Sequence, residues 1–209
     1  MRKRSRIGAV VVGLVLPAAS LLAGDTPLAR LRMRLSWFDV SGSAAAIEGA
    51  ASHELSTLFA PASIDIDWTR ASTGVQAPDS DVQVIVLEQA PGVPKGVMGA
   101  AFHSDVRPHS VWVYLRHVRS TLGFGSRAEG MLRPTEQALL GRAVGRVVAH
   151  EIVHAYAPGR EHEPTGIMRA RLDAQFLKQK NVQLGKEQVE AVVGGLTGNG
   201  GSILAAPVE

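Results

Sequence analysis

Residues 134–168 read PTEQALLGRAVGRVVAHEIVHAYAPGREHEPTGIM, and the interpretation of the whole chain depends on this stretch. Its first part is apolar at helical spacing and begins with a proline and a threonine, which are typical of helix starts. It then runs into Pro158–Gly159, a strong stop signal. The sequence therefore predicts a long helix over residues 134–156, the strongest helix of the chain.

The polar end of this helix carries His150, Glu151 and His154 in the pattern HExxH. Residues four apart on a helix project from neighbouring turns, so both imidazoles can reach one ion. Glu151 points in an adjacent direction, where it can hold a water molecule without being a ligand. This geometry makes the pattern a signature of zinc hydrolases, and His162 follows just after the turn as a third imidazole.

Two further properties of the predicted helix fit a rigid metal site. Glu151 projects to an otherwise apolar side, where a carboxylate is costly unless it faces a cleft or a cation. Gly141 and Gly145 each cost about 1 kcal/mol against alanine inside a helix. We therefore expect the helix to approach another element closely at these glycines, such as the sheet.

Outside this helix, five stretches either alternate apolar and polar residues or are rich in β-branched residues, which predicts strands. These stretches are residues 29–40, 63–69, 81–89, 96–103 and 110–118. Helical spacing of apolar residues predicts two more helices, over residues 43–62 and 186–196. The order predicts an α+β domain. We expect a mixed, roughly five-stranded sheet packed on the N-terminal helix and the long helix, with a small C-terminal helical part.

Both ends of the chain differ in character from this domain. Residues 1–24 have the layout of a secretory signal peptide, with basic MRKRSR, apolar IGAVVVGLVL and the small-residue stretch PAASLLAG. We expect export to a secreted or periplasmic location, and the alternative is an uncleaved N-terminal membrane anchor. Residues 197–209, TGNGGSILAAPVE, are typical of a flexible tail.

Charge and cysteine content narrow the range of functions. The chain has 22 basic and 19 acidic residues. Without the four basic residues of the stretch MRKRSR, 18 basic and 19 acidic residues are left, which gives a net charge of −1. No basic run or aromatic-interleaved patch is left that would indicate nucleic-acid binding. The absence of cysteine excludes disulfides, thiolate zinc ligands and cysteine nucleophiles.

The stretch HEIVHAYAPGREHEPTGIM resembles the active-site segment of the metzincin clan of zinc endopeptidases. In that clan, HExxHxxGxxH supplies three histidine ligands, and a methionine turn lies beneath the metal. The resemblance implies that one catalytic Zn²⁺ is bound by His150, His154 and His162. It also implies that Glu151 is the general base and that Met168, in the GIM sequence, has a structural role.

The likeness spans residues 30–168 and implies a zincin-like catalytic domain over residues 28–196. The sequence is also similar to a group of uncharacterised exported bacterial proteins that have a longer spacer and a GIMR-like ending. It departs from the main pattern because Ala157 and Arg160 stand where the clan has its glycine and its third histidine. The third ligand would thus be His162, which lies two residues after the position of the clan's third histidine. Its rivals are Glu161, Glu163 and Asp173.

The function implied is that of an exported zinc endopeptidase. Three neutral imidazoles leave a fourth position on the ion, where the pKa of bound water falls towards about 7, and Glu151 takes its proton. In the resembling family a peptide or protein substrate lies along the edge strand of the sheet. The candidate strand is residues 96–103, where Gly99, Ala100 and Ala101 would let a peptide backbone approach.

Two alternatives share these residues. One is a zinc-binding protein that holds a peptide or partner without cutting it, because the ligands and Glu151 are necessary but not sufficient for hydrolysis. The other is a zinc-dependent amidase that acts on cell-wall or small amide substrates. The sequence leaves the oligomeric state open. His103, His109 and His117 lie in loops or at strand ends, where we expect solvated side chains rather than ligands.

Overall fold

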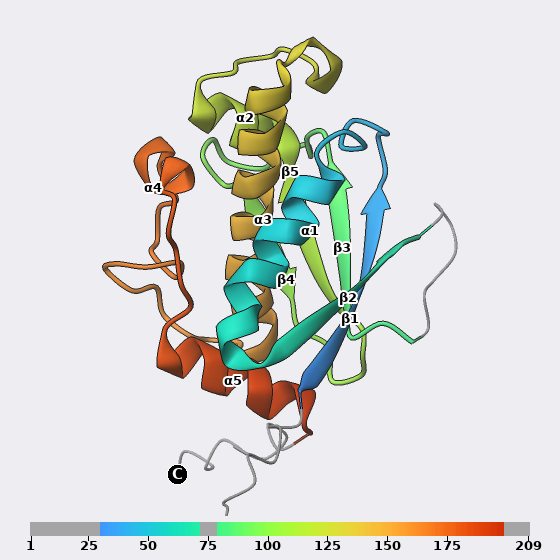
Figure 1. Cartoon of the computed structure of the whole chain (residues 1–209), viewed down its shortest axis with the longest axis vertical. Helices are drawn as coiled ribbons and strands as arrows, with labels where there is room; N and C mark the ends of the chain where they lie inside the picture. The colour runs from blue at the N-terminus through green and yellow to red at the C-terminus, as the bar shows by residue number, and fades with distance from the viewer. Residues whose placement is uncertain (1–29, 72–78, 199–209) are drawn as a thin grey trace, which may run out of the picture.

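The computed structural model describes residues 30–71 and 79–198 of the 209-residue chain (Figure 1). The signal peptide or anchor expected at residues 1–24 lies outside these ranges, as does the tail beyond Gly198. No helix within the described ranges is long and apolar enough to cross a membrane. The elements, in chain order, are β1 (Leu31–Asp39), α1 (Glu48–Phe59), the 3₁₀ turn η1 (Ala60–Ala62), β2 (Ile64–Arg70), β3 (Val82–Leu87), β4 (Gly99–Phe102), β5 (His109–Tyr114), α2 (Leu115–Leu122), the 3₁₀ turn η2 (Glu129–Met131), α3 (Pro134–Tyr156), α4 (Ala174–Lys178) and α5 (Lys186–Leu196).

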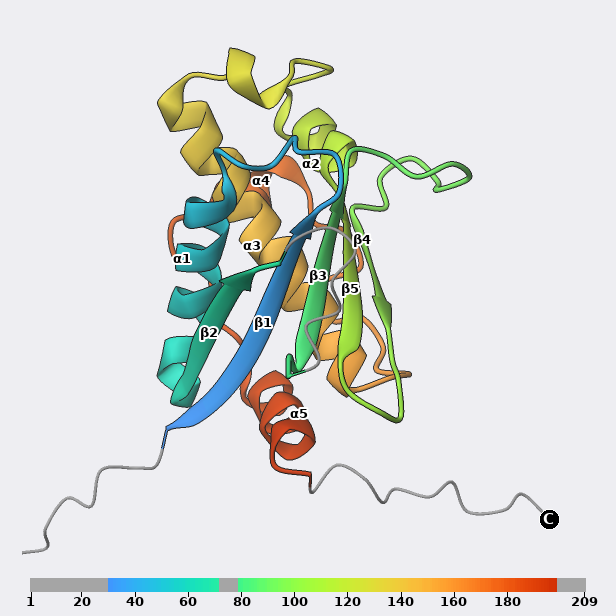
Figure 2. The ribbon, with the colours of Figure 1, turned by 90° about the vertical axis from the view of Figure 1, so that its right-hand side faces the viewer.

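The five strands form one mixed sheet in the order β2-β1-β3-β5-β4. The first four of these run parallel to one another, whereas β4 pairs antiparallel with β5 and forms one edge. Both α1 and α3 cover the same face of the sheet, and α5 lies at one end of it (Figure 2). The predicted α+β class with a mixed five-stranded sheet is confirmed.

Alternation along the strands places the apolar side chains between the sheet and the helices. Val82, Val84 and Val86 of β3 are fully buried, while the residues between them are half-buried. In β1, Met33 and Trp37 occupy the same inner face and are likewise fully buried. The core therefore lies between this face and the two long helices, and α3 is positioned from one side by the sheet.

The predicted strand over residues 110–118 is wrong in its second half. The strand β5 ends at Tyr114, and α2 begins at the next residue. Leu115, Val118 and Leu122 are all buried at helical spacing, so three apolar residues one turn apart favour a helix packed on α3 over an extended strand. The short helix α4 was not predicted either, because five residues are too few to show a periodicity.

The glycines of α3 lie against α1 rather than against the sheet, which corrects the expected packing partner. A β-carbon on Gly141 would lie 2.5 Å from the Ala50 Cβ, and one on Gly145 would lie 2.7 Å from the Ala51 carbonyl oxygen. Both distances are too short for any side chain, so the two helices touch backbone to backbone there. This contact holds α3 firmly on the side away from the predicted ligands.

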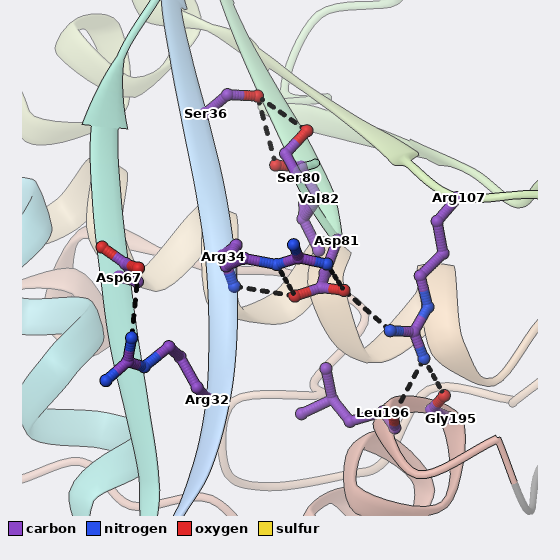
Figure 3. A network of polar contacts seen from close by, with 10 residues as sticks. All are labelled: Arg32, Arg34, Ser36, Asp67, Ser80, Asp81, Val82, Arg107, Gly195 and Leu196. Carbon is purple, nitrogen blue, oxygen red and sulfur yellow. Dashed lines mark hydrogen bonds and ion pairs between the residues drawn. The ribbon is translucent and has the colours of Figure 1, made fainter. Parts of the chain in front are cut away.

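A buried carboxylate, Asp81, joins β1 to the start of β5 and to α5 (Figure 3). It accepts a hydrogen bond from the Arg34 backbone N–H at 2.8 Å and one from the Arg107 guanidinium at 2.7 Å. Arg107 also donates to the carbonyl oxygens of Gly195 and Leu196. The last turn of α5 is thereby tied to the sheet through one arginine.

We expect Asp81→Asn to lower the free energy of unfolding by about 2 kcal/mol at pH 7. Burial alone would raise the pKa of Asp81, but the hydrogen bonds from Arg34 and Arg107 outweigh it and lower this pKa below its ordinary value of 3.8. A lowered folded-state pKa stabilises the protein above the unfolded-state pKa, and the effect is lost as pH falls through the folded value. Urea unfolding at pH 7 and at decreasing pH below 4 measures this.

The difference between Asp81→Asn and wild type should shrink as the pH falls below 4. The exposed Asp65, which pairs with Arg30 on the sheet surface, provides the matched control. Asp65→Asn should change the unfolding free energy little at either pH, because exposed ion pairs are screened by solvent. An Asp81→Asn penalty that stayed constant from pH 7 to pH 2 would contradict the assignment.

Candidate metal centre

The last two turns of α3 carry the residues of the HExxH pattern at the edge of the core. His150 and Glu151 are 6% and 8% exposed, whereas His154 is half-buried. The helix stops after Tyr156, because Ala157 already has a non-helical backbone conformation. The two histidines therefore project from one side of the helix end, with the glutamate beside them, as the four-residue spacing predicts.

A short reversal after the helix brings the third histidine back over the first two. Gly159 adopts φ +83°, in the left-handed region that favours glycine. The loop that follows is closed by the Glu163 backbone N–H, which donates to the Met168 carbonyl oxygen at 2.7 Å. His162 lies just before this closure. The predicted glycine reversal thus exists, two residues later than in the HExxHxxGxxH pattern.

The three imidazoles converge on one point. One nitrogen from each of His150, His154 and His162 lies within 4.8 Å of the other two. The Nε2 atoms of His154 and His162 are 3.3 Å apart, about the separation expected of two nitrogens bound to one tetrahedral zinc ion. Within residues 30–71 and 79–198, this is the one cluster of three or more metal-ligating side chains.

A backbone carbonyl fixes the orientation of the innermost imidazole. The Ile167 carbonyl oxygen lies 2.7 Å from His150 Nδ1, so Nδ1 carries the proton and donates it there. The lone pair is then on Nε2. Burial, together with the neighbouring imidazoles, lowers the pKa of His150 to about 4, so this side chain is neutral at pH 7. A second-sphere hydrogen bond of this kind is typical of histidine ligands.

The GIM turn contacts the histidine cluster through its backbone. Gly166 has φ +75°, which lets the chain turn there, and the next two residues, Ile167 and Met168, are fully buried. The turn has two direct consequences for the site. Its Ile167 carbonyl orients His150, and its Met168 carbonyl closes the loop that carries His162.

Glu151 lines a cleft of about 270 Å³ together with the three histidines. Burial raises the pKa of its carboxyl to about 8 when no cation is nearby, and a bound cation would favour the ionised form. The side chain lies directly against Gly99. A β-carbon there would lie 2.7 Å from Glu151 Oε1.

The three acidic rivals for the third ligand are used elsewhere or stay apart. Glu163 accepts hydrogen bonds from Arg160 at 2.7 Å and from Gln188 at 2.8 Å. Asp173 caps α4 by accepting the Phe176 N–H. Glu161 is exposed and is not part of the converging group. The geometry therefore favours three nitrogen donors and no carboxylate.

The predicted substrate strand is β4, which forms the edge of the sheet beside α3. Gly99 lines the cleft, and the preceding residues Val97 and Met98 form part of the same wall. Ala100 and Ala101 continue the strand, but neither belongs to the cleft lining formed by the described residues. Of the three predicted positions, the structure thus places one next to Glu151 and two further along the edge.

The remaining histidines of this region are not all solvated as expected. His109 is only 6% exposed, stacks on His103 and meets the edge of the Tyr156 ring. His103 Nδ1 lies 2.9 Å from the Ala155 carbonyl oxygen, and His117 Nδ1 lies 2.5 Å from that of Val97. His103 Nε2 also lies 3.8 Å from the Asp105 carboxylate, and none of the three histidines belongs to the converging group.

Sequence reasoning missed several cleft residues. Arg169, Ala170 and Leu172 line the cleft from the segment after the methionine, and the Ile167 carbonyl orients a histidine. A backbone carbonyl has no sequence signal of its own, but the arginine directly after GIM could have been considered. No protein-family model and no curated protein matches this sequence.

Proposed function

We propose that this protein is a zinc-dependent endopeptidase that hydrolyses peptide bonds with Glu151 as general base. The observation that supports the proposal most strongly is the convergence of three imidazoles beside a buried glutamate in one cleft. The resemblance of the stretch from His150 to Met168 to the metzincin pattern points to the same activity.

Zinc is the metal that the donor set favours. Calcium and magnesium prefer oxygen ligands, whereas the group here offers three nitrogens and no carboxylate or thiolate. Imidazole suits several transition metals, but three protein ligands with an open fourth position are typical of catalytic zinc. His150 would bind through Nε2, because its Nδ1 donates to Ile167.

When bound, zinc would lower the pKa of a water molecule in the cleft to about 7 and polarise a substrate carbonyl. Glu151 would accept a proton from the attacking water and release it to the leaving nitrogen as the peptide C–N bond breaks. Met168 and Ile167 would keep the histidines in place.

The substrate would be a peptide or protein outside the cytoplasm. The signal-peptide layout of residues 1–24 supports an exported, secreted or periplasmic protein, tethered to the membrane where that segment is not cleaved.

Elemental mass spectrometry of the purified protein tests the metal site. We expect about one zinc per chain in wild type and less than a tenth of that in His154→Ala and His162→Ala. Wild type should cleave casein in a chelator-sensitive manner, and these two variants should not. Removal of one of three ligands should cost most of the affinity, because zinc binding depends on all of them.

His53→Ala is the matched control, since His53 is an exposed histidine on α1 away from the cleft. It should retain both zinc and cleavage. Zinc without cleavage of any protein would favour a binding protein of the same fold over a peptidase. Absence of zinc from wild type after reconstitution would overturn the proposal.

A further inference from the structure

The cleft has an asymmetric charge distribution that the proposed hydrolysis does not use. Apart from the histidines, its charged lining residues are Glu151 and Arg169. The Arg169 side chain is 30% exposed. Its guanidinium makes no hydrogen bond within residues 30–71 and 79–198. It lies over the Phe176 ring and 3.7 Å from an Asp173 carboxylate oxygen.

Arg169 also lines a second cavity next to the cleft. This cavity has a volume of about 370 Å³ and contains no carboxylate among its described lining residues. Arg169 borders both spaces, so it lies between the metal cleft and the second cavity. Its polar lining consists of one hydroxyl, one guanidinium and three carboxamides, from Thr165, Arg169, Gln179, Asn181 and Gln183.

The segment that forms this flank is basic. Residues 169–183 contain four basic side chains and one acidic one, which gives a charge of +3. Arg171, Lys178 and Lys180 are all exposed. The excess of exposed cations on this segment creates a positive field that attracts negative charge.

We propose that this flank selects acidic peptides, with Arg169 pairing with an aspartate or glutamate side chain of the substrate close to the scissile bond. This inference rests on the proposed peptidase function. A guanidinium can donate two parallel hydrogen bonds to a carboxylate, and no hydrogen bond within the described parts of the chain uses the guanidinium of Arg169. The Asp173 carboxylate is close enough to attract Arg169 but makes no hydrogen bond with it, so a substrate carboxylate can take its place.

Cleavage of matched peptides tests the selection. Each pair differs only by glutamate or glutamine, placed in turn at positions on both sides of the scissile bond. At the best position, wild type should cleave the glutamate peptide with a kcat/KM about tenfold to a hundredfold higher, as expected for a charge-assisted pair. Arg169→Gln should bring the ratio close to one, and Arg169→Lys should keep part of it.

Arg32→Gln is the control for net charge, because Arg32 is an exposed arginine on β1. It should leave the glutamate preference unchanged. Thermal unfolding of each variant shows whether Arg169→Gln remains folded. Cleavage by wild type with equal kcat/KM for both peptides of every pair would overturn the inference while leaving the peptidase function intact.

Binding to the zinc-loaded Glu151→Gln variant separates the two proposals. Isothermal titration with uncleaved peptides should show the same tenfold or greater preference for glutamate, and Glu151→Gln/Arg169→Gln should lose it. That result supports the selection even where no peptide is cut. Binding of inorganic polyphosphate in an Arg169-dependent manner, with no preference among the peptides, would overturn it in favour of a polyanion that is not a peptide.

Discussion

Glu151→Gln should lower the rate of peptide-bond hydrolysis by about a thousandfold and leave the zinc content near one per chain. Glutamine has nearly the same size and fits the same space against Gly99, so the cleft keeps its shape. The glutamine side chain, however, cannot accept the proton of the attacking water. The loss should therefore appear in kcat, with little change in KM, and is measured with a fluorogenic peptide at pH 7.

A matched variant separates the role of Glu151 from a general loss of negative charge. Glu161 is an exposed glutamate in the loop after α3 and lies outside the converging group. Glu161→Gln should retain zinc and most of the activity. If Glu151→Gln cleaved the peptide at the wild-type rate, Glu151 could not be the general base, whatever the metal content.

Arg146→Met should lower the free energy of unfolding by about 3–5 kcal/mol, the largest effect we expect on stability. Arg146 of α3 is fully buried. It donates to Glu54 of α1 at 2.7 Å and to the carbonyl oxygens of Phe176 and Gln179 at 2.8 and 2.7 Å. Methionine fills similar space but leaves one carboxylate and two carbonyls without this partner.

Urea unfolding measures the effect, with Arg116→Met as the control. Arg116 is an exposed arginine on α2 that donates to Gln89, and its replacement should change the unfolding free energy by less than about 0.5 kcal/mol. Arg146 contacts α1 and the α4 segment rather than the metal ligands. Arg146→Met should therefore change the free energy of zinc binding less than it changes the free energy of unfolding. Equal stability of the two variants would show that the buried network contributes nothing net.

Much of the fold followed from short-range patterns. Alternation or β-branched residues predicted the five strands, and apolar residues at helical spacing predicted α3, because the buried face of a strand or helix repeats over a few residues of sequence. The same reasoning failed at Leu115, where the alternation of β5 runs directly into the helical spacing of α2. Both patterns contain apolar residues at overlapping positions, so only packing against α3 separates them.

Local sequence also predicted part of the candidate site, and tertiary contacts decided the rest. His150, Glu151 and His154 are linked by local helix geometry, which a spacing of four residues specifies completely. His162 also lies within one loop of the helix, and a glycine at the reversal signals its return. Glu163 and Asp173 were rivals of His162 for the third ligand in the sequence. They are excluded from the cluster by Arg160, Gln188 and the start of α4, which are tertiary neighbours.

The sequence by itself determined most of the elements, the α+β class and the candidate metal-binding residues, because each follows from patterns that are local in the chain. Only the tertiary structure decided which groups surround them. It brought Gly99 against Glu151, placed the glycines of α3 on α1 rather than on the sheet, and set Arg169 between two cavities. These contacts join distant segments or depend on the path of a loop, so no local sequence periodicity can predict them.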